Sequence, residues 1–194
     1  MYVTHSCSKN TIEYIFRSIL PPLNTNHTVL DVGSRLGAVL YGAYLFSGAG
    51  KLIGIEVNNE LCELQSHVIQ TFGFSDRASV IHAEMTTRPD VFALADVIIL
   101  NNVFEWFVEA QYQNLMWQFL CNNIKVGALI VTMPSMEKAT NGLSMGIKLE
   151  HWVKPLNRIN SDIIDSPLKD SDVDIFLYEV ISKPTALKDI PVSM

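Results

Sequence analysis

Hydrophobic and polar residues alternate along the chain in two patterns, one typical of helices and one typical of buried strands. Short apolar runs that stop at polar residues or at glycine predict strands at Thr28–Val32, Leu52–Val57, Ala78–Ala83, Ala95–Leu100, Ala128–Met133 and Asp174–Ser182. Apolar residues at helical spacing predict helices over about 8–20, 36–47, 58–72 and 108–123, and a short helix within Met136–Leu149. Strand and helix therefore alternate along most of the chain.

This alternation predicts an α/β fold, in which a mostly parallel sheet carries helices on both faces. We expect one domain over residues 1–183, with residues 1–22 as a helical lead and residues 184–194 as a flexible tail. In such sheets the ligand site lies outside the carboxyl ends of the strands, where the strand order reverses. The residues that close the predicted strands are therefore the first candidates for function.

Acidic or amide side chains stand at the ends of several predicted strands. Asp31 and Glu56 close the first two strands, Glu84 follows the third, and Asn101-Asn102 follow the fourth. A carboxylate at Glu56 can accept both hydroxyls of a ribose, and one at Glu84 can face an adenine amino group. The alternatives are solvated acids at strand ends and, for the two asparagines, caps of the next helix.

The segment between the first strand and the next helix reads VLDVGSRLG, from Val29 to Gly37. Gly33 can adopt backbone angles that are closed to other residues, and it lets a ligand come close. The N-terminus of the following helix offers N–H groups that have no partner within the helix. Alternatively, the segment is a plain strand-to-helix turn that uses glycine.

The segments VLDVGSRLG, GIEVNNELC, VIHAEM, ADVIILNNVF and KVGALIVTMPS, in this order and spacing, resemble class I S-adenosylmethionine (SAM) dependent methyltransferases. The resemblance covers Val29–Ser135, and DIFLYEVIS stands where that fold has its antiparallel seventh strand. It implies a Rossmann-like, doubly wound, mostly parallel seven-stranded sheet with an antiparallel late strand. It also implies SAM as the cofactor.

The same resemblance implies roles for individual residues at the cofactor site. Asp31, Gly33 and Gly37 line the methionine end of SAM in this interpretation. Glu56 binds the ribose with Val57 beside it, and Glu84 lies near the adenine.

Arg35 departs from the pattern of this class, which usually has glycine in the middle of the loop. Its guanidinium can bind the carboxylate of the methionine part of SAM through a fork of hydrogen bonds. It can instead point to solvent, or it can strain the loop and fill the pocket. We expect Arg35 to assist binding of the cofactor.

The sequence LNNVF, followed by an aromatic-rich helix start, resembles the non-SET, seven-strand histone lysine methyltransferases more weakly. In that family an amide and an aromatic residue after the fourth strand line the acceptor channel. The resemblance implies Asn101 and Phe104 as catalytic residues here, with Asn102 and Trp106 beside them. Asn101 also belongs to the expected cofactor site.

Composition narrows the class of protein. The chain of 194 residues has a formal net charge of −6, which is unfavourable for strong nucleic-acid binding. Its 3 cysteines lie far apart without a CxxC pair, which favours a reduced intracellular compartment, cytoplasmic or nuclear, and argues against a zinc site. No apolar stretch reaches the roughly 20 residues that span a membrane, so no membrane association is expected.

These observations predict an intracellular SAM-dependent methyltransferase that acts on a nitrogen, in a protein lysine or a small amine. The alternative is a methyltransferase-fold protein that has lost turnover and serves as a binding module or partner subunit. Arg35 and the lack of a basic segment favour the alternative. The sequence makes no prediction about oligomeric state.

Overall fold

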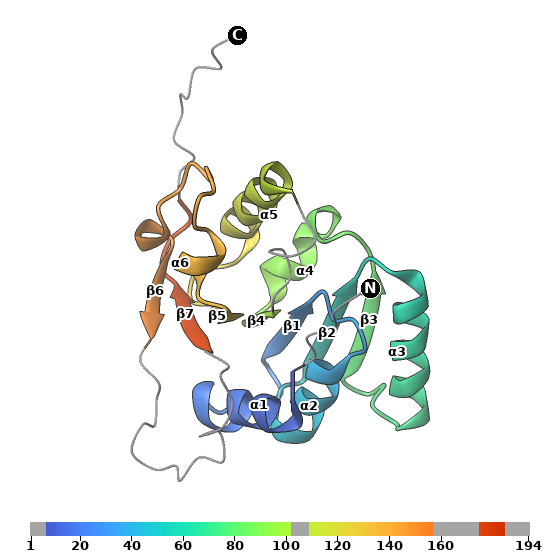
Figure 1. Cartoon of the computed structure of the whole chain (residues 1–194). Helices are drawn as coiled ribbons and strands as arrows, with labels where there is room; N and C mark the ends of the chain where they lie inside the picture. The colour runs from blue at the N-terminus through green and yellow to red at the C-terminus, as the bar shows by residue number, and fades with distance from the viewer. Residues whose placement is uncertain (1–6, 102–108, 157–174, 185–194) are drawn as a thin grey trace.

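The computed structural model describes residues 7–101, 109–156 and 175–184 (Figure 1). The strands are β1 (Thr28–Val32), β2 (Lys51–Glu56), β3 (Ala78–His82), β4 (Val97–Asn101), β5 (Leu129–Met133), β6 (Val153–Leu156) and β7 (Phe176–Val180). The α-helices are α1 (Lys9–Tyr14), α2 (Ala38–Phe46), α3 (Asn59–Thr71), α4 (Pro89–Leu94), α5 (Ala110–Asn123) and α6 (Met136–Ala139). A π-helical segment η1 (Ile15–Ile19) continues α1, and η2 (Met85–Thr87) and η3 (Leu149–His151) are short 3₁₀ turns.

All strands join one 7-stranded sheet with the order β3-β2-β1-β4-β5-β7-β6. Strands β1 to β5 pair in parallel, whereas β7 is antiparallel to both β5 and β6. The strand order reverses at β1, because the chain runs outward to β3 and then returns to place β4 on the other side of β1. The predicted Rossmann-like fold, with its antiparallel late strand, is confirmed.

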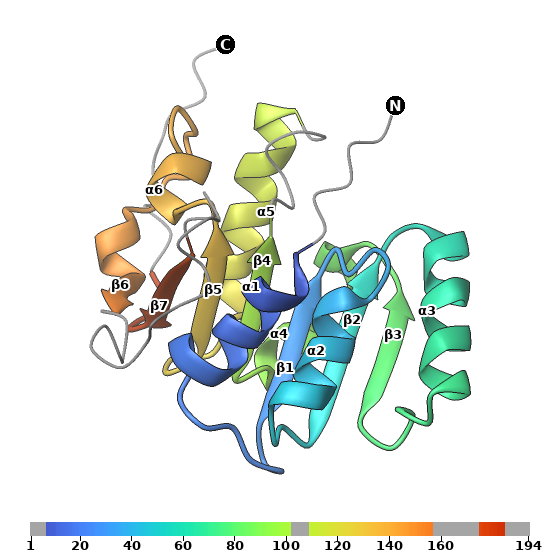
Figure 2. The same ribbon diagram turned by 60° about the horizontal axis from the view of Figure 1, so that its bottom comes forward.

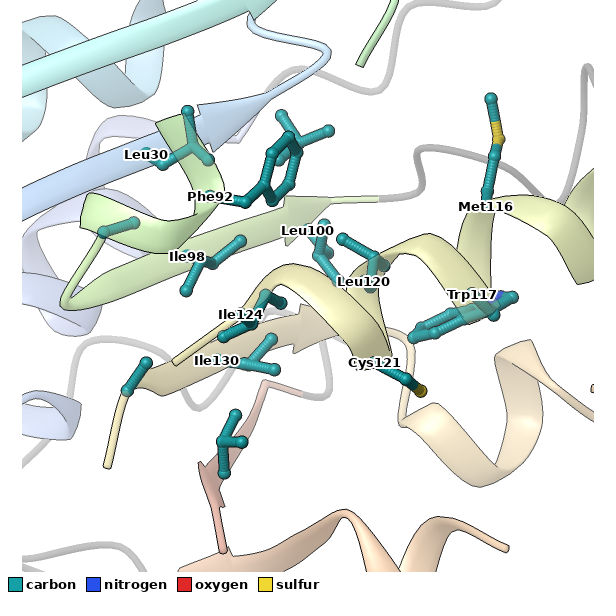
Figure 3. Close-up of a cluster of buried hydrophobic side chains, with 14 of the residues drawn as sticks. Leu30, Phe92, Ile98, Leu100, Met116, Trp117, Leu120, Cys121, Ile124 and Ile130 are labelled. Carbon is teal, nitrogen blue, oxygen red and sulfur yellow. The ribbon is translucent and has the colours of Figure 1, made fainter. Parts of the chain in front are cut away.

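Helices cover both faces of the sheet, as Figure 1 and Figure 2 show, with α1 and α2 on one face and α4 and α5 on the other. Alternate residues of each strand serve alternate faces. Val29, Leu52 and Ile99 pack under α1 and α2 in one apolar cluster. The cluster on the other face (Figure 3) joins Leu30 and Ile98 to side chains of α4 and α5. Burial on both faces explains why the strand sequences are almost continuously apolar.

Side-chain caps fix the start of several helices. Ser8 Oγ accepts a hydrogen bond from the backbone N–H of Thr11 at 3.1 Å, at the start of α1. Asn58 Oδ1 accepts from the N–H groups of Glu60 at 2.9 Å and Leu61 at 3.2 Å, at the start of α3. Serine and asparagine suit these positions because their side-chain oxygens satisfy the first free N–H groups of a helix.

Helix α2 begins at Ala38, two residues later than the predicted start at Leu36. Gly37 precedes it with φ +78°, a left-handed conformation that cannot continue a right-handed helix. The backbone of the loop thus sets the first turn of α2, which lies next to the end of β1.

Three elements from α4 onward differ from the sequence-based expectation. Helix α4 and strand β6 were not predicted, because both are short and each contains a proline. Proline suits the first turn of a helix, as in α4, and an edge strand, as in β6. The helix predicted within Met136–Leu149 is wrong beyond Ala139, since α6 has only 4 residues.

Arg77, just before β3, connects the start of that strand to the end of α2 and to the residues that follow α2. Its guanidinium donates to the carbonyl oxygens of Tyr44 at 2.7 Å, Ser47 at 3.2 Å and Ala49 at 2.8 Å. It also lies 4.1 Å from the centre of the Tyr44 ring, which stacks on Phe74. Arg77 therefore supplies hydrogen-bond donors to the carbonyl groups that the end of α2 leaves free.

Candidate functional site

The carboxyl ends of β1, β2 and β4 bring three of the predicted residues to one edge of the sheet. Strand β1 lies between β2 and β4, at the point where the strand order reverses. The face that α1 and α2 cover carries Asp31, Glu56 and Asn101. Each of them lies an even number of positions from a residue of its own strand that packs on that face, and such residues point to the same side of a sheet. The strand ends thus converge beside the start of α2.

The loop between β1 and α2 has an unusual backbone. Gly33, Arg35 and Gly37 have φ angles of +68°, +48° and +78°. The N–H groups of Gly33 and Ser34 donate to the carbonyl of Ile55, at 2.9 and 3.2 Å. The left-handed conformation suits the two glycines, whereas at Arg35 it is strained. The backbone strain that the sequence analysis gave as an alternative at Arg35 is therefore present in the structure, and the role of Arg35 in binding the cofactor stays a prediction.

Glu56 is buried and organises the loop around its carboxylate. Its Oε2 accepts from the backbone N–H of Arg35 at 2.9 Å, and its Oε1 accepts from the N–H of Asn58 at 2.9 Å. A carboxylate has about four acceptor positions on its two oxygens. Glu56 therefore holds the loop in place and keeps acceptor capacity for a ligand.

Asp31 is a buried acid, and the charged group that acts on it is the carboxylate of Glu56. Burial and the Glu56 carboxylate raise the pKa of Asp31 to about 8. Burial favours the neutral form of a carboxyl group, and a like charge acts in the same direction. The Asp31 carboxyl group therefore holds its proton more tightly than an exposed carboxyl does, and a cation beside it would lower this pKa.

A small cavity of about 30 Å³ lies between these residues. Its lining includes Cys7, Asp31, Gly33, Arg35 and Asn101. The Nδ2 of Asn101 donates to the sulfur of Cys7 at 3.0 Å, and both residues line the cavity. Burial, with a smaller contribution from Asp31, raises the pKa of the Cys7 thiol to about 12, so this thiol is neutral.

Glu84 and Val57 lie near the same edge of the sheet, outside the residues that line the cavity. Glu84 Oε2 accepts from the N–H of Thr86 at 2.9 Å and from the Thr86 hydroxyl, which caps the turn η2. Its Oε1 is buried without a hydrogen-bond partner. Val57 is 66% exposed directly after Glu56. Glu84 thus has a capping role, and one of its oxygens remains available.

Gln65 on α3 is a site residue that the sequence analysis missed. Its side chain is fully buried, and it donates from Nε2 to the carbonyl of Arg35 at 2.6 Å. Its Oε1 accepts from the Ser34 hydroxyl at 2.9 Å. Gln65 shares the buried face of α3 with Cys62 and Ile69. A polar residue at an apolar helical position was the available signal.

The other predicted acceptor-site residues, Asn102, Phe104 and Trp106, lie outside the described residues. Within the described ranges, no group of three or more His, Cys, Asp or Glu is placed to hold a metal ion. In the same ranges, no helix has the length and apolar character that a membrane crossing requires.

No protein-family profile and no curated protein matches this sequence. Solved structures do share its fold. An RNA methyltransferase from Salinibacter ruber, in complex with S-adenosyl-L-homocysteine (SAH), gives a TM-score of 0.56 at 13% identity, over 84% of this chain and 86% of that one. An rRNA methylase from Streptococcus thermophilus gives 0.55 at 12% identity, over 92% and 100%. A geranyl diphosphate methyltransferase in complex with SAM gives 0.54 at 17% identity, over 64% of this chain and 48% of that one.

At these identities the similarity shows a common fold, that of Rossmann-like SAM-dependent methyltransferases. The RNA methyltransferase and the rRNA methylase do not support the expectation that this chain avoids nucleic acid, which stays a prediction. The resemblance to histone lysine methyltransferases and the nitrogen acceptor also stay predictions.

Proposed function

We propose that this chain is a SAM-dependent methyltransferase that acts on a nitrogen acceptor, the amine of a lysine in a protein. The observation that carries the proposal is the pair of buried carboxyl groups of Asp31 and Glu56 at the ends of adjacent parallel strands. SAM carries two cationic groups and a ribose diol. Asp31, a buried acid beside another acid, suits a cationic group, and Glu56, which keeps acceptor capacity, suits the ribose hydroxyls. The shared fold supports the same assignment.

The donor set of the site fits SAM. Glu56 uses two of its roughly four acceptor positions within the chain, so it can accept the ribose hydroxyls. The buried Oε1 of Glu84 has no hydrogen-bond partner and can accept from an adenine amino group. The cavity of about 30 Å³ is far smaller than the roughly 300–1,000 Å³ of ligand sites. Binding of SAM would therefore require some of the residues that line the cavity to move.

When bound, SAM supplies a methyl group that its positive sulfur makes easy to transfer. Asp31 would then pair with a cationic group of the cofactor, and Arg35 would bind its carboxylate. Asn101 would orient the acceptor nitrogen. Phe104, outside the described residues, keeps the role that the resemblance implies for it, which is to line the acceptor channel and exclude water. Positioning of this kind can lower a barrier by about 7–11 kcal/mol, so little acid–base chemistry is needed from the protein.

The charge of the site supports an amine acceptor. Asn101 lines the same cavity as Asp31, so an acceptor beside Asn101 approaches a buried acid. A lysine ammonium would lose its proton to water before transfer, because only the neutral amine has the lone pair that attacks the methyl group. The net charge of −6 also favours a cationic acceptor over a polyanionic one.

The test is transfer of labelled methyl from SAM to a protein extract, to total RNA and to small amines, in parallel reactions. We expect label in protein, on lysine after hydrolysis, and loss of label with Glu56→Ala. Label in RNA alone would overturn the acceptor, and would leave the methyltransferase assignment intact.

A second candidate function is a binding module without turnover, which the small cavity and the Asn101–Cys7 contact favour. Thermal unfolding with SAH distinguishes the two. A ligand at 100 times its dissociation constant stabilises a protein by about 2.7 kcal/mol. Stabilisation by SAH without methyl transfer to any acceptor class would support the module, and stabilisation with transfer would exclude it.

A further inference from the structure

We propose that Gln65 is a positioning residue of this site. It holds the Ser34–Arg35 segment so that the backbone N–H of Arg35 meets the carboxylate of Glu56. The inference rests on the proposed function, because it concerns the loop that would hold SAM. It adds a residue from α3 to a site otherwise built from strand ends and the loop after β1.

Both ends of the Gln65 amide contact this loop. Nε2 donates to the Arg35 carbonyl at 2.6 Å, and Oε1 accepts from the Ser34 hydroxyl at 2.9 Å. The side chain is 0% exposed, so no water competes for these contacts. Gln65 therefore fixes two consecutive loop residues from a helix 30 residues further along the chain.

The Arg35 residue is held from both sides. Its N–H donates to Glu56 Oε2 at 2.9 Å, and its carbonyl accepts from Gln65. Its φ of +48° is unfavourable for a residue with a side chain. Such a conformation persists only where the surroundings determine it. The hydrogen bonds to Glu56 and Gln65 are two of the contacts that hold it here.

The packing around Gln65 is fitted to these contacts. A Cβ on Gly54 of β2 would lie 2.6 Å from Ser34 Oγ, so only glycine leaves room for the Ser34 hydroxyl. A Cβ on Gly37 would lie 3.1 Å from Gln65 Oε1. Two glycines from different elements thus border the Ser34–Gln65 hydrogen bond.

A purely structural glutamine and a positioning glutamine differ in a measurable way. If Gln65 only satisfies buried polar groups, its replacement lowers stability and leaves the ligand affinity of the folded protein unchanged. If it positions the loop, replacement lets Arg35 leave its left-handed conformation. The hydrogen bond from the Arg35 N–H that orients the Glu56 carboxylate is then lost. Affinity of the folded protein is therefore the deciding measurement.

The experiment is calorimetric titration of the full chain with SAH, at a temperature where circular dichroism shows each variant to be folded. We expect Gln65→Met to raise the Kd about tenfold, and Ser34→Ala, which removes one contact, to raise it about threefold. The matched control is Gln118→Met on α5. Gln118 also donates from Nε2 to a backbone carbonyl, that of Met145 at 3.0 Å. We expect the Gln118→Met variant to bind SAH with the same Kd as the wild type.

A double-mutant comparison tests the role of the strained residue. Glycine adopts a positive φ without strain, so Arg35→Gly makes the loop less dependent on Gln65. We expect Gln65→Met to raise the Kd by about threefold or less in the Arg35→Gly background, against about tenfold alone. If Gln65→Met does not fold, Ser34→Ala is compared in the two backgrounds instead.

The outcomes separate the two proposals. Wild-type protein that does not bind SAH refutes the proposed function and, with it, this inference. Wild-type binding with an unchanged Kd in the folded Gln65 variant refutes the positioning role alone. An equal increase in Kd in both Arg35 backgrounds also refutes it, because the effect would then not pass through Arg35.

Discussion

Asp31 makes the stability of this protein depend on pH in a direction opposite to that of an ordinary carboxylate. Burial, and then the charge of Glu56, raise the pKa of Asp31 from 3.8 to about 8 in the folded chain. Between these values the folded state holds a proton that the unfolded state releases. The contribution of this group to the free energy of unfolding is fully present below about pH 4, and it is lost as the pH rises toward 8.

The size of the effect follows from the two pKa values. Each pKa unit corresponds to about 1.4 kcal/mol, and most of the interval lies between pH 5 and pH 7.5. Integration over that range gives a loss of about 3 kcal/mol, which is large against a typical domain stability of about 5–15 kcal/mol. Asp31→Asn keeps the shape and cannot ionise, so it abolishes this loss.

The assay is urea unfolding of wild type and Asp31→Asn at several values between pH 5 and pH 7.5. We expect the variant to gain about 3 kcal/mol relative to wild type across this range. Asp96→Asn is the matched control. Although burial opposes it, hydrogen bonds from Lys125 and Thr28 lower the pKa of Asp96. The Asp96 effect therefore lies below this range, and its offset should stay constant. A constant offset for Asp31→Asn as well would refute the reasoning.

Three further changes test the site and its loop. Glu56→Ala should raise the Kd for SAH about tenfold or more in calorimetry, because charge-assisted bonds are worth about 1.5–3 kcal/mol each; an unchanged Kd in a folded variant would contradict the role of Glu56. Arg35→Gly should raise the free energy of unfolding in urea by about 1 kcal/mol through relief of its positive φ, and a loss of stability would show that the side chain contributes more than the strain costs. Gly54→Ala should lower that free energy by about 2 kcal/mol, since its Cβ would lie 2.6 Å from Ser34 Oγ; a neutral change would mean that Ser34 moves freely.

The sequence predicted the parts of the site that depend on strand ends. The carboxyl ends of parallel strands meet at one edge, so an acid at the end of TVLDV and another at the end of GIEV had to lie close together. The helix caps formed by Ser8 and Asn58 are equally local, because each joins a side chain to N–H groups of the same helix. Such features follow from residue type and position within one element.

Features that depend on tertiary contact could not be predicted in this way. The hydrogen bonds of Gln65 join a helix to a loop 30 residues earlier, and helical periodicity says only that the position is buried. Strand β6 has only 4 residues, and its partly exposed edge leaves no apolar run. The contact of Asn101 with Cys7, 94 positions apart, likewise depends on how the lead before α1 packs on the sheet.

The three carbonyl contacts of Arg77 have a consequence for how the molecule opens. Strand β3 is the outer strand on its side of the sheet, with β2 as its single neighbouring strand, and outer strands are usually the first to separate. The Arg77 guanidinium binds the start of β3 to the end of α2, so β3 cannot leave unless those hydrogen bonds break as well. We therefore expect the outer strand and α2 to exchange their amide protons as one cooperative unit. Because α2 begins at the loop that bears Arg35, we expect opening of that unit to disturb the candidate site as well.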